Sequence, residues 1–204
     1  MVRAAILTSG EGTLFQSVLD AMFFGEIPDF ELVGVITTKE NAYTARRAAN
    51  AGVCLFTVEP EDFPTLLSYS MAISNKLKDM DIDLVISAGF DKPLGVVSTQ
   101  FRKRIIGVYP ALVPAFTDGV EDPVRAALER GCKVSGATAY FADIDGRIGP
   151  IIAQQSVEVR ADDSAETLSK RILEEAEWKL LPRAVALFCQ NKLEIHGDRV
   201  VIKA

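Results

Sequence analysis

The sequence predicts an α/β protein built on a mainly parallel, doubly wound sheet with helices on both faces. Short apolar runs without polar alternation indicate strands that are buried on both sides. Segments with helical spacing of apolar residues separate these runs, which suits right-handed crossovers between parallel strands. The 204 residues, 49% of them hydrophobic, are enough for one substantial core.

The first half alternates strands and helices. Its expected strands are the apolar runs at residues 3–8, 32–37, 54–58, 84–88 and 105–108. The helices expected between them begin at Leu14, cover residues 43–51 with Gly52 as the end signal, and run from Pro64 to about residue 78.

The second half predicts a different arrangement. A helix should start at Asp122-Pro123 and end before Gly131, and residues 134–142 and 151–160 should form an antiparallel hairpin on the edge of the sheet. Residues 163–166 carry helix-start chemistry for one long helix. Its expected buried stripe is Leu168, Ile172, Ala176, Leu180 and Val185. Residues 193–195 and 199–202 should close the chain as a hairpin around His196-Gly197-Asp198.

Charge and composition exclude several classes of protein. The net charge of −6 and the lack of a basic block argue against nucleic-acid binding. The apolar run after Met1 is too short for a signal peptide or a membrane span, so we expect a cytoplasmic protein without membrane contact. Cys54, Cys132 and Cys189 form no C-x-x-C pair, which favours reduced, small buried or half-buried thiols and no metal site. His196, the one histidine, should be an exposed turn residue.

The segment 105–114 is the first candidate for a site, because ligands of open α/β sheets collect beyond the carboxyl ends of strands. Two prolines, Pro110 and Pro114, force an extended exit from the strand. The segment nevertheless offers only Gly107 and Tyr109 where an enzyme would be expected to place polar groups.

Two loops carry further candidates, and each has a plain structural alternative. The glycine-rich loop can hold a phosphate at a helix N-terminus or be an ordinary strand-to-helix turn, and its Glu11 opposes an anion. This loop consists of Ser9, Gly10, Glu11, Gly12 and Thr13. The loop between the two long strands contains Asp143, Asp145 and Arg147, which can serve acid–base chemistry or simply form a turn.

The order and spacing of six short motifs resemble the glycinamide ribonucleotide (phosphoribosylglycinamide) formyltransferase family over residues 3–188. The motifs are Ser9-Gly10-x-Gly12-Thr13, Ala88-Gly89-Phe90, Pro110-Ala111-Leu112-Val113-Pro114-Ala115-Phe116, Lys133-Val134-Ser135-Gly136-Ala137-Thr138, Gly149-Pro150-Ile151-Ile152-Ala153-Gln154 and Leu180-Leu181-Pro182.

This resemblance implies a formyltransferase fold with a mostly parallel, seven-stranded sheet and a Rossmann-like N-terminal half. It implies one domain over residues 1–204, with a nucleotide-binding-like half at 1–104, a formyl-transfer-like half at 105–190 and a terminal hairpin at 191–204. It also implies a ribonucleotide phosphate at the loop 9–13 with Glu177 near the sugar, and 10-formyltetrahydrofolate in a pocket at Gly89, Phe90, Asp91 and Lys92.

The chain departs from the family where the family does its chemistry. The family's catalytic asparagine, histidine and aspartate correspond to Gly107, Tyr109 and Arg147, although a loop shifted by two residues would bring Asp145 to the last position. Glu11 and Leu14 replace asparagines of the phosphate loop, and Trp178 follows Glu177 in place of a histidine.

We therefore expect a purine-biosynthesis formyltransferase relative that is inactive or altered in the standard reaction, a pseudoenzyme with a binding or regulatory role. The alternative is an active folate-dependent transferase with a site rebuilt from Tyr109, Asp143, Asp145 or Arg147. Its partners would be small ribonucleotide or folate-like ligands, and the chain would be a monomer or a homodimer.

Overall fold

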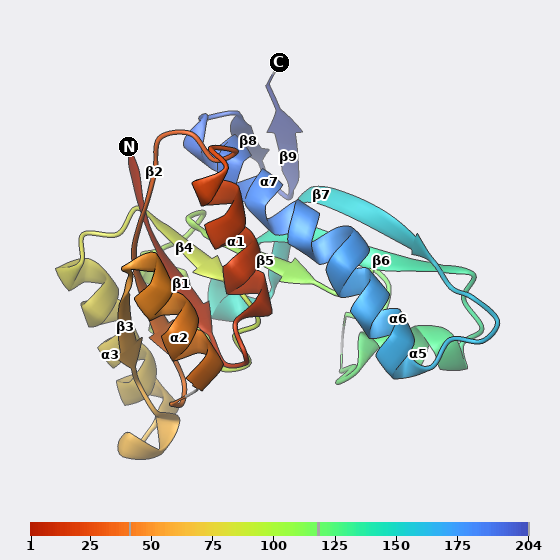
Figure 1. Cartoon of the computed structure of the whole chain (residues 1–204), viewed down its shortest axis with the longest axis horizontal. Helices are drawn as coiled ribbons and strands as arrows, with labels where there is room; N and C mark the ends of the chain where they lie inside the picture. Colours follow the sequence, from red (N-terminus) through yellow and green to blue (C-terminus); the bar gives the residue numbers. More distant parts are fainter. Residues whose placement is uncertain (41, 118, 204) are drawn as a thin grey trace.

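One mixed sheet organises the computed structural model of the chain, which describes residues 1–40, 42–117 and 119–203, without the side chains of Ala42 and Asp145 (Figure 1). Within those ranges the sheet has nine strands in the order β3-β2-β1-β4-β5-β6-β7-β9-β8. The strands are β1 (Val2–Thr8), β2 (Phe30–Thr37), β3 (Cys54–Thr57), β4 (Leu84–Ser87), β5 (Ile105–Tyr109), β6 (Val134–Ala142), β7 (Ile148–Glu158), β8 (Leu193–His196) and β9 (Arg199–Ile202). The first five run parallel, and β6 is antiparallel to both β5 and β7.

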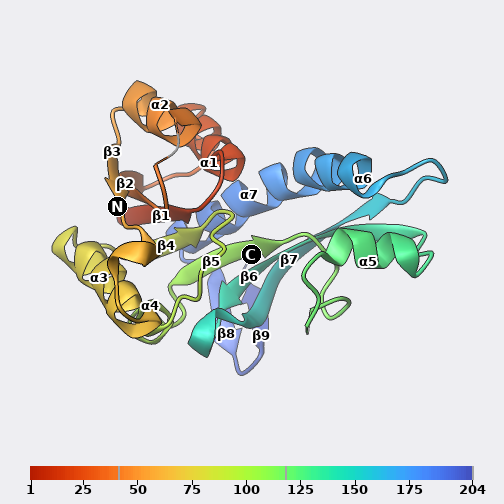
Figure 2. The same cartoon turned by 90° about the horizontal axis from the view of Figure 1, so that it is seen from below.

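Helices cover both faces of this sheet. Figure 2 shows α1, α2, α6 and α7 on one face and α3 and α4 on the other. The α-helices are α1 (Thr13–Phe23), α2 (Ala42–Ala51), α3 (Leu66–Asp79), α4 (Val96–Gln100), α5 (Pro123–Glu129), α6 (Ala165–Ile172) and α7 (Trp178–Cys189). Short 3₁₀ turns occupy Pro60–Asp62 and Ile144–Gly146, and a π-helical segment, Leu173–Glu177, joins α6 to α7.

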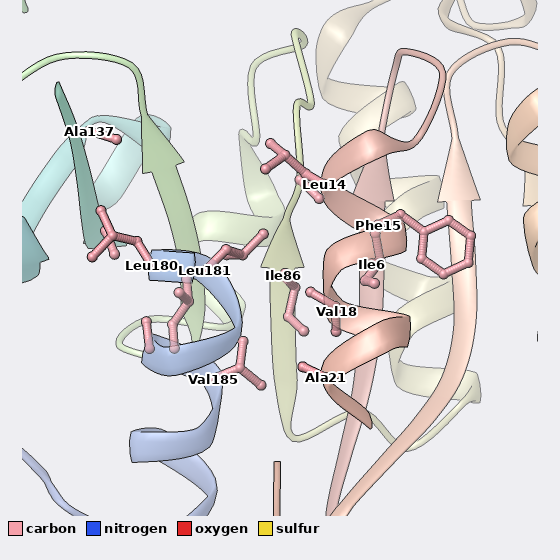
Figure 3. Packing of buried hydrophobic residues seen from close by; sticks show 14 of the residues in the cluster. Ile6, Leu14, Phe15, Val18, Ala21, Ile86, Ala137, Leu180, Leu181 and Val185 are labelled. Atoms are coloured by element: carbon pink, nitrogen blue, oxygen red, sulfur yellow. The ribbon is translucent and has the colours of Figure 1, made fainter. Parts of the chain in front are cut away.

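The central strands are buried on both sides, as their unbroken apolar runs predict. In β1, Ala4 and Ile6 face the core under α1 and α7, whereas Ala5 and Leu7 face the core under α3 and α4. Figure 3 shows Leu14 and Val18 of α1 and Leu181 and Val185 of α7 converging on Ile6 and Ile86. Each buried aliphatic side chain contributes about 1.5–3 kcal/mol relative to an exposed one, so this double-sided packing dominates the stability of the sheet.

The sheet differs from the prediction at its far edge. The strands β6 and β7 form the expected antiparallel hairpin, but its placement at the edge is wrong, because β9 pairs with β7 and puts β8 outermost. The terminal hairpin therefore raises the expected seven strands to nine. The strand β7 also starts at Ile148 and not at residue 151, since Ala142 pairs with Ile148 across a shift in register.

Two helix expectations also need correction. Pro64 does not open α3: Thr65 is the N-cap, and it exchanges capping hydrogen bonds with Ser68. The long helix after residue 163 is not one α-helix, because the π-helical segment interrupts it. The predicted starts at Asp122 and Ser164 are confirmed, since each side chain caps its helix.

The thiols and the histidine lie away from the sheet's centre. Cys132 and Cys189 are partly buried, as expected, but Cys54 is exposed because β3 is an edge strand. His196 is exposed at the end of β8, as predicted, where its Nε2 lies 3.3 Å from Glu194. No helix within the described ranges is both long and apolar enough to span a membrane.

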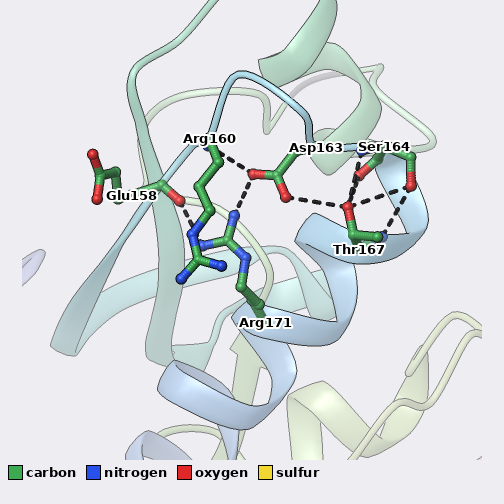
Figure 4. Close-up of polar contacts among 6 residues, drawn as sticks. All are labelled: Glu158, Arg160, Asp163, Ser164, Thr167 and Arg171. Carbon is green, nitrogen blue, oxygen red and sulfur yellow. Dashed lines mark hydrogen bonds and ion pairs between the residues drawn. The ribbon is translucent and has the colours of Figure 1, made fainter.

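A polar cluster fixes the junction between β7 and α6 (Figure 4). The Asp163 carboxylate accepts hydrogen bonds from the Arg160 amide at 2.7 Å and the Thr167 hydroxyl at 3.1 Å, and it pairs with the Arg171 guanidinium. Arg171 also donates to the Glu158 carbonyl at 2.8 Å. Burial acts to raise the pKa of Asp163, but these hydrogen bonds and the Arg171 charge outweigh it and hold the pKa below its usual value.

Replacing Asp163 by Asn should lower the free energy of unfolding by about 1–3 kcal/mol at neutral pH, because the ion pair and part of the hydrogen bonding are lost. A lowered folded-state pKa gives stability that is present above the unfolded pKa near 4 and is lost as the pH falls through the folded value. Urea unfolding of the wild type and Asp163→Asn should therefore converge below about pH 4. The exposed neighbour supplies the control, Asp162→Asn. Equal urea midpoints for the wild type and Asp163→Asn at pH 7 would contradict this account.

Candidate functional site

The loop after β5 lies at the end of the sheet where the parallel strands have their carboxyl ends, as the sequence predicts for segment 105–114. The loop after β5 is held by side chains of the neighbouring strands. Thr138 of β6 donates to the Ala111 carbonyl at 2.7 Å and accepts from the Val113 amide at 3.1 Å. Gln154 of β7 donates to the Val113 carbonyl at 2.9 Å. The loop is therefore a fixed wall and not a loose connection.

Tyr109 makes a further contact of this wall. Its hydroxyl donates a hydrogen bond of 2.6 Å to the Phe116 carbonyl, seven residues further along the chain. Because that phenolic proton is used inside the protein, the hydroxyl oxygen faces a ligand mainly as an acceptor.

A cavity of about 580 Å³ opens at this edge. It is lined by Tyr109, Val113, Thr117, Tyr140, Asp143, Gly146, Arg147 and Ile148. The structure thus brings Tyr109 and Arg147 together, two of the three candidate catalytic residues. The side chain of Asp145, the third, lies outside the part of the chain that the structure describes.

Tyr140 is a residue of the site that the sequence reasoning missed. It pairs directly with Gly107 across the antiparallel β5–β6 ladder. A Cβ atom at residue 107 would lie 3.0 Å from both Cζ and Oη of Tyr140, closer than a normal contact. The Tyr140 ring therefore occupies the space in which a side chain at position 107 would begin.

The loop between β6 and β7 has the hydrogen bonds of a turn. The Asp143 amide donates to the Arg147 carbonyl at 2.8 Å, and the Gly146 amide donates to the Asp143 carbonyl at 3.0 Å. These are main-chain bonds, so the side chains of Asp143 and Arg147 stay available to the cavity they line. The turn explanation and the chemical one are compatible here.

The glycine-rich loop lies beside the loop that follows β4. The Ser9 amide donates to the Gly89 carbonyl at 3.1 Å, and the Ser9 hydroxyl accepts from the Asp91 amide at 3.1 Å. Gly12 takes a left-handed conformation as the N-cap of α1, and no side chain caps that helix. The unpaired N–H groups of a helix start are suited to an anion.

Side chains of α2 hold this loop from the other side. Thr44 donates to the Gly10 carbonyl at 2.9 Å, and Arg47 donates to the Glu11 carbonyl at 3.2 Å. Arg47 adds positive charge near the start of α1, whereas the exposed Glu11 subtracts it. The phosphate cradle and the ordinary turn both remain consistent with this geometry.

The four candidate folate-pocket residues follow β4. Gly89 has a left-handed backbone, Phe90 packs on the core under α3, and Lys92 lies 3.5 Å from the Asp91 carboxylate. They do not line the cavity at Tyr109. The two regions meet through Leu94, whose side chain would lie 3.2 Å from a Cβ atom added to Gly146.

Glu177 is buried at the end of the π-helical segment, with 8% of its surface exposed. Burial raises the pKa of its carboxyl to about 7. It lines neither the cavity at Tyr109 nor a second hollow of about 670 Å³ between α1 and α7, which sequence reasoning also missed. Trp178, Phe24 and Arg47 contribute to that second hollow. No cluster of three or more potential metal ligands occurs among the described residues.

The fold, together with the cavity at the carboxyl ends of the parallel strands, agrees with one class of protein. The sequence profile of the formyl transferase family matches residues 2–185, so the chain belongs to the formyl transferase family.

Individual members of this family are similar to the chain in sequence and in structure. The phosphoribosylglycinamide formyltransferase of Mycobacterium tuberculosis is 41% identical over 202 residues, which cover 98% of this chain and 88% of the relative. The crystal structure of glycinamide ribonucleotide transformylase 1 from Symbiobacterium toebii superposes with a TM-score of 0.93 at 37% identity, covering 100% of this chain and 95% of that one. A formyltetrahydrofolate deformylase from Pseudomonas syringae pv. tomato shares the fold at a TM-score of 0.88 and 20% identity, covering 100% of this chain and 66% of that one.

Replacing Glu177 by Gln should remove a pH-dependent loss of stability. A folded-state pKa of about 7, above the unfolded value near 4.3, means that the folded protein keeps the proton while the unfolded chain loses it. Stability should then fall as the pH rises from about 4 to about 7, by roughly 4 kcal/mol at most. Urea unfolding should show that the stability of Glu177→Gln relative to the wild type is higher at pH 8 than at pH 5. The exposed neighbour gives the control, Glu175→Gln, and a parallel pH dependence of wild type and Glu177→Gln would refute the assignment.

Proposed function

We propose that this chain is a phosphoribosylglycinamide formyltransferase relative that binds ligands in the family's cleft but does not carry out the standard formyl transfer at an ordinary enzyme rate. The observation that carries this proposal is the lining of the cavity at Tyr109. Residue 107 has no side chain, and the Tyr109 proton is donated to the Phe116 carbonyl. The resemblance to the family implies Arg147 at the aspartate position when the loop is read without a gap, and Asp145 when it is shifted by two residues.

General acid–base catalysis at neutral pH needs a group whose pKa lies near the working pH. Tyrosine titrates near pH 10 in water, and burial, with a smaller contribution from Tyr109, raises the pKa of Tyr140 to about 12. Arginine keeps its proton throughout. The described lining of the cavity therefore contains no histidine, and Asp143 is the carboxylate among these residues that could accept the amine's proton.

The size of the expected defect follows from typical losses. Removing one oxyanion-stabilising donor costs about 10²–10³ in rate, and removing the general acid–base group costs about 10²–10⁴. The two effects do not simply add. We expect a combined loss of roughly 10³-fold or more relative to an intact member of the family.

Ligand binding is supported by the parts of the scaffold that remain. The loop Ser9–Thr13 presents an uncapped helix start beside Arg47, which suits the phosphate of a ribonucleotide. The segment Gly89–Lys92 is hydrogen-bonded to that loop, and the resemblance to the family implies that 10-formyltetrahydrofolate would bind beside it. A relative from Drosophila pseudoobscura pseudoobscura, 33% identical over 94% of this chain, is named a trifunctional purine biosynthetic protein, which supports a role next to purine biosynthesis.

A second candidate is an active transferase with a rebuilt site. It is favoured by one observation: Tyr109, Tyr140, Asp143 and Arg147 line a single cavity. Such a site would stabilise charge through the phenol and the guanidinium, and it would leave proton removal to Asp143 or to solvent.

One assay separates the two candidates. Purified protein is mixed with 10-formyltetrahydrofolate and glycinamide ribonucleotide, product formation is followed, and the binding of each ligand is measured by calorimetry. The Mycobacterium tuberculosis relative, run in parallel, sets the ordinary rate. We expect binding with turnover at least about 10³-fold below that rate. Turnover within tenfold of the relative would overturn the proposal, and failure to bind either ligand would exclude both candidates.

The Tyr109→Phe variant tests the rebuilt site. It should lower the free energy of unfolding by about 1 kcal/mol, because the hydrogen bond to the Phe116 carbonyl is lost. If Tyr109 took part in catalysis, the turnover number would fall well beyond what this loss of stability explains. An unchanged turnover number with lower stability is the result we expect. Tyr43→Phe, on the exposed face of α2, is the matched control.

A further inference from the structure

Gly107 has no backbone reason to be glycine. It lies inside β5 in an ordinary strand conformation, whereas glycines such as Gly12 and Gly89 take left-handed conformations that other residues avoid. A glycine within a strand often marks the close approach of another group. Here that group is the Tyr140 ring, with Cζ, Oη and Cε1 all 3.0–3.3 Å from where a Cβ atom would be.

The cross-strand pairing explains why this ring and not another lies over Gly107. Gly107 is directly opposite Tyr140, and Tyr109 is directly opposite Thr138. Gly107 and Tyr140 therefore behave as one unit: the glycine provides the space, and the tyrosine fills it. Any side chain at 107 would push the ring by at least a few tenths of an ångström.

The Tyr140 hydroxyl is a hydrogen-bond donor that lines the cavity and is not used within the described part of the protein. Tyr140 is partly exposed and lines the cavity of about 580 Å³. Its hydroxyl forms no hydrogen bond with another residue in the described ranges, so its proton is available to a ligand in the cavity that Tyr140 lines. Tyr109, in contrast, has committed its proton to Phe116.

We propose that the Tyr140 hydroxyl recognises the ligand's carbonyl oxygen in this cavity by donating a hydrogen bond to it. Gly107 is a positioning residue, because its lack of a side chain leaves room for the Tyr140 ring. Resting on the proposed function, the ligand group is the formyl oxygen of 10-formyltetrahydrofolate. A neutral phenol donates one hydrogen bond to that oxygen, and no covalent step is involved. Its high pKa keeps the donor protonated throughout the neutral range, so the preference should not change between pH 6 and pH 9.

The test compares two probes that differ by the formyl group. Calorimetry with 10-formyltetrahydrofolate and with tetrahydrofolate gives the preference of the wild type, expected at about two- to tenfold for one neutral hydrogen bond. Tyr140→Phe keeps the ring and removes only the hydroxyl, so the preference should fall to near one. Tyr43→Phe, outside the cavity, should keep it.

Gly107→Ala tests the positioning role. It should reduce the preference as Tyr140→Phe does, and it should have little further effect in the Tyr140→Phe background. Near-native urea midpoints for the variants confirm that each is folded. Equal affinity of the wild type for the two probes, binding of neither probe, or an unchanged preference in Tyr140→Phe would each overturn the assignment.

Binding of neither probe would overturn the assignment and the proposed function together, whereas probe binding with an unchanged preference in Tyr140→Phe would overturn the assignment alone. Turnover is measured on the same samples, and rapid formyl transfer would overturn the proposed function alone. A preference that disappears in Tyr140→Phe would still establish Tyr140 as the residue that recognises the formyl group.

Discussion

The antiparallel register between β5 and β6 is the constraint on which the cavity depends. It sets Tyr140 opposite Gly107 and Thr138 opposite Tyr109, so each strand supplies one tyrosine to the same edge of the sheet. It also places the Thr138 hydroxyl where it can bond both Ala111 and Val113. A slip of one residue would turn these side chains to the opposite face and remove both the wall and the ring over Gly107.

The hydrogen bonds around the loop after β5 determine the geometry of the site and not its reactivity. Thr138, Gln154 and Tyr109 hold the loop after β5 by hydrogen bonds of 2.6–3.1 Å. Such bonds fix geometry, but they provide no group that exchanges protons near neutral pH. Buried polar networks of this kind stabilise one arrangement of the backbone whether or not a reaction follows. The persistence of the family's fold is therefore no measure of the family's activity.

Local patterns predicted what depends on local causes. The buried strands follow from apolar runs such as residues 3–8, and the helix starts follow from the capping side chains of Asp122 and Ser164. The attachment of β9 could not be predicted, because it rests on one residue pair, Ile151 with Arg199, far apart in the sequence. Pro64 misled the prediction because a proline just before an N-cap and one just after it look alike in sequence.

The candidate site likewise contains residues that the sequence predicts and one that only the fold reveals. Tyr109 and Arg147 were identified from their places in motifs, and the structure brings both to one cavity. Tyr140 was overlooked because its role comes from a cross-strand neighbour 33 positions away in the numbering (140 − 107), which only the register reveals. A glycine at an otherwise undemanding strand position is the one signal that could have pointed to it.

The π-helical segment sets the rotational phase of the last long helix. Leu168, Ile172, Ala176, Leu180 and Ala184 are all buried and stand four residues apart. In an unbroken α-helix each such step advances about 40° beyond a full turn, so four steps would carry the stripe about 160° away from the sheet. The wider turn at Leu173–Glu177 absorbs one residue, or about 100° of that drift. Deleting a single residue there would leave a regular helix whose second half still faces the sheet, whereas winding all the residues into a regular α-helix without a deletion would turn that half's apolar side toward the solvent.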